Sequence, residues 1–163
     1  MQHTISIIVE NKFGVLSRIT GLFSGRGYNI ESLCVAPLDD NRYSRVTLVT
    51  SGNDKVVEQI TKQLHKLINT LKVTDLTCEE HIERELLLVK ISCPNTTIRS
   101  EILQVMDIFR GKTVDVAVKS ITVEVTGAAE KIDAFIDMIR PFGIKEMART
   151  GKVAMLRGQK PLT

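Results

Sequence analysis

Apolar residues along this chain alternate in short runs typical of strands, separated by segments in which they recur at helical spacing. In the first half, residues 4–10 read as a buried strand. From Val15 to Phe23 the apolar positions form a single helical stripe. Further strands are expected at 29–38, 43–50 and 71–76. A second helix is expected to begin near Asp54, with an inner face made of Val56, Val57, Ile60, Leu64, Leu67 and Ile68.

The same order of elements restarts after residue 84. An apolar strand at 86–91 is followed by a helix face, a hairpin, a second helix face and a closing strand at 144–155. Arg26-Gly27 and Arg110-Gly111 follow the first helix of each half, which supports an internal repeat. The expected fold is α+β, with two tandem ferredoxin-like βαββαβ modules whose antiparallel sheets carry helices on one face. The helix faces of the second half contain Ile98, Ile102, Met106, Phe109, Ile132, Phe135, Ile136 and Ile139.

An acidic, polar stretch at 79–84 reads as a linker, so the expected domains are 1–78 and 85–163. A ferredoxin-like module leaves one face and the edges of its sheet open. Because an exposed strand edge offers unpaired backbone groups, such modules commonly pair edge to edge, and we expect a homodimer.

Composition narrows the class of protein. Aromatic residues make up 4% of the 163 residues and the net charge is +3, neither of which favours a nucleic-acid partner. The three cysteines are far apart and odd in number, which favours a reducing compartment. The first apolar run ends at Glu10, too soon for a signal peptide or a membrane span. A cytoplasmic protein is therefore expected.

Candidate catalytic groups are sparse. His3, His65 and His81 have no ligand partner at helical spacing and no nucleophile beside them, so we expect neither a catalytic nor a metal site. A glycine-rich phosphate loop is also missing from the sequence.

The segment from Asn11 to Leu16 joins a buried strand to the start of a helix. Free N–H groups and the helix dipole favour an anion at such a position, and Gly14 allows a ligand to approach the backbone. The same residues also suit an ordinary turn in which Asn11 and Gly14 serve only their own backbone. Local chemistry leaves both interpretations open.

The Asn-x-x-Gly-x-Leu turn resembles that of an ACT domain, a ligand-sensing module that usually binds amino acids between protomers. Over a longer stretch the chain resembles the small regulatory subunit of acetolactate synthase (acetohydroxyacid synthase), and the resemblance covers nearly the whole sequence in order. It is carried by residues 14–19 (GVLSRI), 26–33 (RGYNIESL), 81–86 (HIEREL), 109–111 (FRG), 131–135 (KIDAF) and 148–151 (ARTG).

This resemblance implies a subunit without catalytic activity of its own that regulates a large catalytic subunit. The catalytic partner would use thiamine diphosphate, Mg²⁺ and FAD to transfer a two-carbon unit from pyruvate, in the synthesis of valine, leucine and isoleucine. The small subunit would bind no cofactor, raise the activity of its partner and confer feedback inhibition by valine. Its second module is expected to contribute to contact with the catalytic subunit.

The resemblance also implies an effector site shared between two ACT domains. Asn11, Gly14, Val15 and Leu16 would come from one protomer, and Asn29 and Ile30 would come from the other. Ser17 and Ala36 would flank the site.

Three features depart from the family pattern. Cys34 replaces a residue that is more often a hydroxyl, and Phe13 is bulkier than usual before Gly14. In the second module, Pro94 removes a backbone donor from the corresponding turn, so no second site of this design is expected. An alternative function, a free-standing ACT-type sensor that regulates another enzyme or a transcription factor, remains open, as does the preference among valine, leucine and isoleucine.

Overall fold

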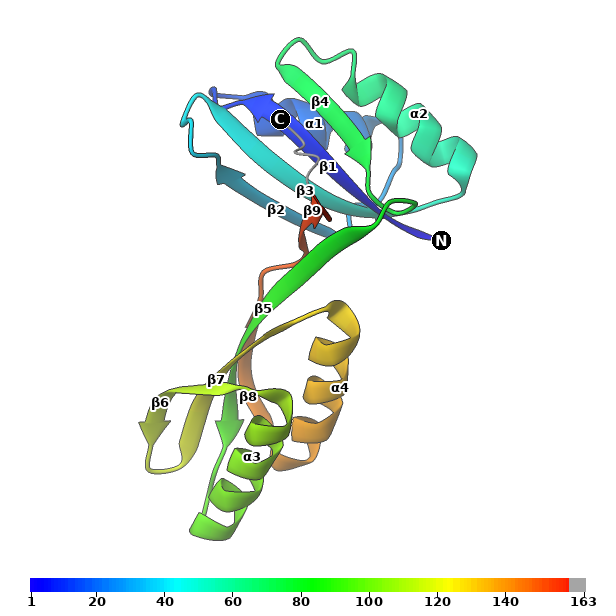
Figure 1. Cartoon of the computed structure of the whole chain (residues 1–163). Helices are drawn as coiled ribbons and strands as arrows, with labels where there is room; N and C mark the ends of the chain where they lie inside the picture. The colour runs from blue at the N-terminus through cyan, green and yellow to red at the C-terminus, as the bar shows by residue number, and fades with distance from the viewer. Residues whose placement is uncertain (159–163) are drawn as a thin grey trace. The chain divides into compact units, whose positions relative to one another are not determined.

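Two antiparallel sheets, each carrying two helices on one face, make up the structure, a computed structural model that describes residues 1–158 (Figure 1). The chain divides into two units. The first comprises Met1–Glu83 and the segment from Lys152 onward, and the second comprises Arg84–Gly151. The expected α+β fold of two βαββαβ modules is confirmed. No helix among the described residues is long and apolar enough to cross a membrane.

The first unit has its strands in the order β2-β3-β1-β4. Its apolar strand residues Ile5, Ile7 and Leu48 are fully buried against Ile19 and Phe23 of the first helix. This packing fixes the start of that helix beside the end of β1. The elements are β1 (Gln2–Glu10), α1 (Val15–Gly25), β2 (Ser32–Pro37), β3 (Tyr43–Ser51), α2 (Asp54–Leu64) and β4 (Thr70–Asp75).

The second unit repeats this arrangement with the strand order β6-β7-β5-β8. Ile102, Phe135 and Ile139 lie fully buried in its core, as the helical spacing predicts. The elements are β5 (His81–Ser92), α3 (Thr96–Phe109), β6 (Lys112–Ala117), β7 (Ser120–Gly127), α4 (Ala129–Ile139), the 3-10 turn η1 (Arg140–Phe142) and β8 (Ile144–Arg149); β9 (Val153–Leu156) follows and pairs with β5.

The second helix is shorter than expected. Helix α2 ends at Leu64, and successive turns, Leu67 N–H to Leu64 O and Thr70 N–H to Leu67 O, carry the chain into β4. Ile68 therefore lies in a turn with 92% of its surface exposed, and its predicted place on the inner helix face is wrong. Leu67 still packs against the core.

The boundary between the units also differs from the expected one. Strand β5 begins at His81, so most of the expected linker at 79–84 is strand. The expected closing strand at 144–155 is interrupted at Gly151, which has a φ of 78°, and only its first part, β8, belongs to the second unit. The final strand β9 returns to the first unit, where it lies against β1.

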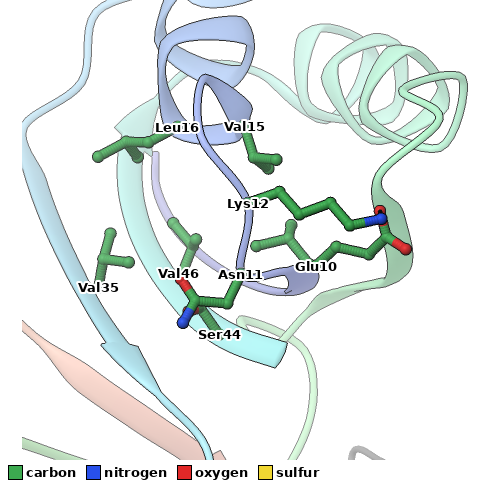
Figure 2. Close-up of a pocket in the computed structure, with 9 residues that line it drawn as sticks. Glu10, Asn11, Lys12, Val15, Leu16, Val35, Ser44 and Val46 are labelled. Carbon is green, nitrogen blue, oxygen red and sulfur yellow. Dashed lines mark ion pairs between the residues drawn. The ribbon is translucent and has the colours of Figure 1, made fainter. Parts of the chain in front are cut away.

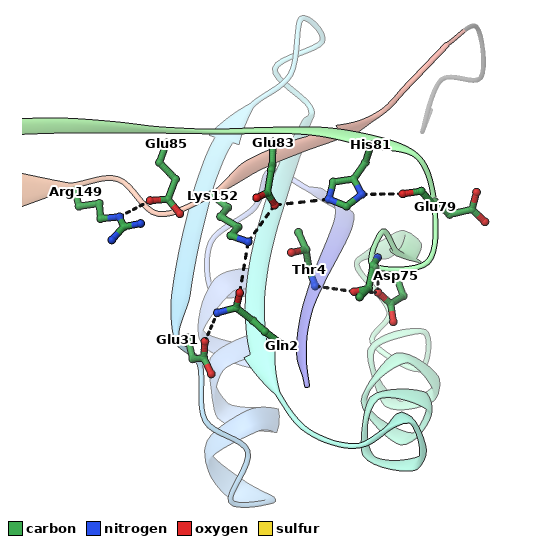
Figure 3. Close-up of polar contacts among 11 residues, drawn as sticks. Gln2, Thr4, Glu31, Asp75, Glu79, His81, Glu83, Glu85, Arg149 and Lys152 are labelled. Atoms are coloured by element: carbon green, nitrogen blue, oxygen red, sulfur yellow. Dashed lines mark hydrogen bonds and ion pairs between the residues drawn. The ribbon is translucent and has the colours of Figure 1, made fainter. Parts of the chain in front are cut away.

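Strand β9 and the start of β5 cover part of the sheet face that was expected to be open. Leu76, fully buried, packs with Ala154 and Leu156 in a small apolar cluster. Ser6 and Thr47, on the strands beneath, are each 2% exposed. Figure 3 shows this strand pair crossing in front of β1 and β3.

Candidate functional site

The loop between β1 and α1 has the geometry of a ligand-binding turn. Gly14 adopts a φ of 79°, in the left-handed region that glycine enters without a steric penalty. Its carbonyl accepts a hydrogen bond from the Arg18 N–H at 3.1 Å, which starts the helix. No side chain caps this helix N-terminus.

The backbone N–H groups of the loop are largely unused. Val15 N–H lies 3.3 Å from the carbonyl oxygen of Lys12, at the long end of the hydrogen-bond range. Within residues 1–158, the N–H groups of Gly14, Leu16 and Ser17 have no backbone acceptor. Because unsatisfied N–H groups at a helix start carry partial positive charge, this turn favours a carboxylate.

A pocket lies beside this helix start (Figure 2). Its wall is apolar and comes from β1, the start of α1 and the paired strands β2 and β3. Its rim is polar and lies at the end of β1. The lining residues are Val9, Val15, Leu16, Val35 and Val46 on the apolar side and Glu10, Asn11, Lys12 and Ser44 on the polar side.

Two side chains at the rim are held in place by neighbours. The amide nitrogen of Asn11 donates to the carbonyl of Asn41 at 2.9 Å, which leaves its amide oxygen to accept from a ligand. A hydrogen bond from Asn69 and an ion pair with Lys12 lower the pKa of Glu10 below its ordinary value. The Glu10 carboxylate is thus engaged by Asn69 and Lys12 (Figure 2), so the rim offers the Asn11 amide oxygen to a cation, next to backbone N–H groups that suit an anion.

The structure brings only part of the predicted site together. Asn11, Val15 and Leu16 line one pocket, with Gly14 between them in sequence. Asn29 and Ile30 lie near the opposite end of β2, where the Thr50 hydroxyl donates to the Asn29 carbonyl at 2.6 Å. One protomer alone therefore does not unite the two groups of residues.

The flanking and departing residues stay outside the pocket lining. Ser17 is exposed on α1, and Ala36 is exposed on β2. Cys34 pairs with Thr47 and is half-buried, whereas its neighbour Val35 is the β2 residue that lines the pocket. The side chain of Phe13 is fully exposed.

Six of the lining residues were not predicted as site residues from the sequence: Val9, Glu10, Lys12, Val35, Ser44 and Val46. The pairing of Val35 with Val46, and of Val9 with Ser44, places them at the pocket. The alternation within each strand was visible in the sequence, but the register between strands was not.

The corresponding turn of the second module is built differently. The side chain of Asn95 accepts a hydrogen bond from Ile98 N–H at 2.9 Å and so caps α3. Arg99 N–H in turn donates to the Asn95 carbonyl. This helix start is satisfied by its own chain, unlike that of α1.

Comparisons with known proteins agree with the two modules. Residues 5–72 match the family described as the AHAS small subunit-like ACT domain, and residues 84–158 match the small subunit of acetolactate synthase. A probable acetolactate synthase small subunit of Archaeoglobus fulgidus is 54% identical over 98% of this chain and 99% of its own length. The chain belongs to the acetolactate synthase small-subunit family.

Other relatives extend this result. An acetolactate synthase small subunit of Aquifex aeolicus is 53% identical over 96% of this chain and 81% of its own. The crystal structure of the acetolactate synthase small subunit from Thermotoga maritima is 39% identical, with a TM-score of 0.89 over 98% of this chain and 99% of that one. Acetolactate synthase small subunits are regulatory subunits, so a large catalytic subunit is the implied partner. No group of three His, Cys, Asp or Glu residues within 1–158 could hold a metal ion.

Proposed function

We propose that this small subunit binds valine and imposes feedback inhibition on the large catalytic subunit of acetolactate synthase, whose activity it raises when valine is absent. The observation that carries the proposal is the pocket beside α1, where unused N–H groups and a polar rim meet an apolar wall. Thiamine diphosphate, Mg²⁺ and FAD would then belong to the catalytic subunit and not to this chain.

The pocket suits each part of a valine molecule. The N–H groups of Gly14 and Leu16 would hold the carboxylate at the positive end of α1. The Asn11 oxygen would accept from the ammonium group. The wall formed by Val35 and Val46 would receive the isopropyl group.

A second protomer would complete this site. Strand β2 is an edge strand of the first sheet, and its residues from Val35 to Pro37 are exposed. Antiparallel pairing of β2 with the same strand of a second copy would bring the partner copy's residues from the far end of β2 toward the Asn11 loop. Asn29 and Ile30 would then face the pocket across the interface.

A shared site links effector binding to the geometry of the dimer. Valine would contact two protomers at once, so it would favour the dimer arrangement in which both contacts form. Because the coupling between the two binding events is reciprocal, binding of the catalytic subunit would in turn change the affinity of the small subunit for valine.

Reconstitution with a thiamine-diphosphate-dependent acetolactate synthase catalytic subunit tests the proposal. We expect the small subunit to raise acetolactate formation, and a valine titration to remove most of this gain. Titration calorimetry on the small subunit alone should show valine binding with one site per protomer, two sites in each dimer. Leucine and isoleucine titrations would rank the effectors.

The outcome also separates the proposal from the alternative sensor function. Valine binding without any change in catalytic-subunit activity would favour a sensor that regulates another protein. Pyruvate turnover by the purified chain alone would contradict a purely regulatory role.

A further inference from the structure

Lys152 is held in an unusual place for a lysine. Only 12% of its side chain is exposed, and its Nζ lies 3.1 Å from a carboxylate oxygen of Glu83. The same Nζ donates a hydrogen bond to the amide oxygen of Gln2 at 3.4 Å. Lysine is seldom buried to this degree without a specific partner, so this position is set by its two contacts.

These contacts join the two points at which the chain passes between its units. Glu83 is the last residue of the first unit before the second unit begins, and Lys152 is the first residue after the second unit ends. Both residues belong to the first unit. Their ion pair therefore links the two positions in the first unit between which residues 84–151 are inserted.

The other end of this set of contacts reaches the proposed effector site. The amide nitrogen of Gln2 donates to a carboxylate oxygen of Glu31 at 2.5 Å, and the hydroxyl of Ser51 donates to the other oxygen. Glu31 directly follows Asn29 and Ile30 in the sequence. Hydrogen bonds from Ser51 and Gln2 lower the pKa of Glu31, so it is an anion at neutral pH.

Figure 3 shows these side chains pointing toward one another across β1 and the start of β5. Gln2 is central because its amide accepts from Lys152 and donates to Glu31. A glutamine amide with both groups engaged cannot rotate without losing one of them. Displacement of Glu31 would therefore alter the contact between Gln2 and Lys152.

We propose that the contacts Glu31–Gln2–Lys152–Glu83 form a relay that couples valine binding at Asn29 and Ile30 to the two chain segments leading into and out of the second unit. The inference rests on the proposed function, because it takes valine as the effector. Lys152 is a positioning residue in this relay and does not contact valine. Occupancy of the site would shift the start of β2, and the relay would change how firmly β9 and the start of β5 are held.

Hydrogen exchange on the full-length small subunit, with and without valine, tests the relay. In the wild type we expect valine to slow exchange in residues 11–17 and to change exchange in 79–84 and 153–157. In Lys152→Met the slower exchange at 11–17 should remain, and the change at 79–84 and 153–157 should fall by more than about half. Valine affinity should stay within ~2-fold of wild type. The reconstituted Lys152→Met complex should lose a matching share of its valine inhibition.

Three further variants make this comparison specific. Lys152→Arg keeps the charge, so it should retain the valine-dependent change of exchange in 79–84 and 153–157 and the valine inhibition of the reconstituted complex. Gln2→Leu removes the central amide at an exposed position, so it tests the relay even if Lys152→Met folds poorly. Lys62→Met removes a lysine from an exposed pair with Glu58 and should leave every valine effect unchanged.

Several results would overturn the relay. One is a wild-type chain in which valine protects 11–17 but leaves 79–84 and 153–157 unaffected. Another is a valine-dependent change of exchange in 79–84 and 153–157 that persists in both Lys152→Met and Gln2→Leu. A third is the loss of valine affinity in well-folded Lys152→Met. Absence of any valine effect on 11–17 in the wild type would instead contradict the proposed valine site.

Discussion

Gly14 combines two properties at one residue. Its φ of 79° lies in the left-handed region at the start of α1, and nothing lies within 4 Å of the position a Cβ would occupy. A side chain at this position would therefore strain the backbone without touching another part of the protein, and it would extend into the space where the proposed ligand binds.

Gly14→Asp should abolish valine binding, because its carboxylate would repel the carboxylate of the ligand. Gly14→Asn is the matched control, since asparagine has nearly the same size, carries no charge and tolerates the left-handed region. Calorimetry should show affinity reduced by more than about 100-fold in the first variant and much less in the second, as like charges in contact cost several kcal/mol. Wild-type affinity in Gly14→Asp would refute the site.

Glu31 gives the first unit a dependence on pH. Because its pKa is lower in the folded chain than in the unfolded chain, its contribution is fully present above the unfolded value, about 4.3. It is lost as the pH falls through the folded value. Urea unfolding at pH 6 and at acid pH measures this loss of stability. The loss should be smaller in Glu31→Gln than in the wild type, and identical losses would contradict this role.

The sequence places together those pocket residues that are close in the chain. Asn11, Gly14 and Leu16 lie in one turn, where spacing alone indicates a helix start. Val35 and Ser44 could not be found in this way, because their place at the pocket depends on the register of β2, β3 and β1.

At the scale of the elements, the two sheets have equivalent edge strands, but only one of them is proposed to form a dimer interface. β2 is one edge strand of the first sheet and β6 is the equivalent edge strand of the second, and every residue of β6 is exposed. Only β2 is continuous with the proposed effector site. The proposed dimer therefore uses β2 of the first unit, and β6 is the alternative edge.

Ala36→Glu should weaken the dimer. In the register that brings Asn29 and Ile30 of the second copy to the pocket, each new carboxylate would lie near Glu31 of that copy, and like charges across strands are destabilising. Sedimentation should show dimer dissociation at concentrations at least ~10-fold higher than for the wild type, with valine affinity falling in parallel. Ala117→Glu, the same change on β6, is the control; equal dissociation of the two variants would shift the interface to the second unit.

Strand β5 shows why the expected linker was not recognised as a strand. Its polar residues His81, Glu83 and Glu85 occupy alternate positions, and charged residues at this density are typical of a solvent-exposed segment. In the structure Glu85 is 5% exposed and ion-paired with Arg149, and Glu83 is paired with Lys152. These partners lie more than sixty residues away in sequence, so local pattern could not reveal them.

At the scale of the whole molecule, the first unit depends on both ends of the chain. Leu76 is fully buried beneath Ala154 and Leu156, whereas Leu71 of the neighbouring strand β4 is 51% exposed. The burial of Leu76 is therefore one apolar contact that ties the first module to β9.

Leu76→Ala should lower the free energy of unfolding of the first unit by about 2–4 kcal/mol, because it removes a buried side chain and leaves a cavity. Leu71→Ala should change it by less than about 1 kcal/mol, since half of that side chain already contacts water. A chain that ends at Gly151 should lose at least as much stability as Leu76→Ala. Thermal unfolding followed by circular dichroism compares all three, and an unchanged melting temperature for the shortened chain would contradict the dependence on β9.

The return of β9 to the first unit also has a consequence during synthesis on the ribosome. Residues 84–151 form a continuous unit that can fold as soon as it has emerged, whereas the first unit waits for the strand at 153–156. We expect the N-terminal module, although translated first, to be completed last. The apolar cluster of Leu76, Ala154 and Leu156 would then close only after the rest of the described chain has been made.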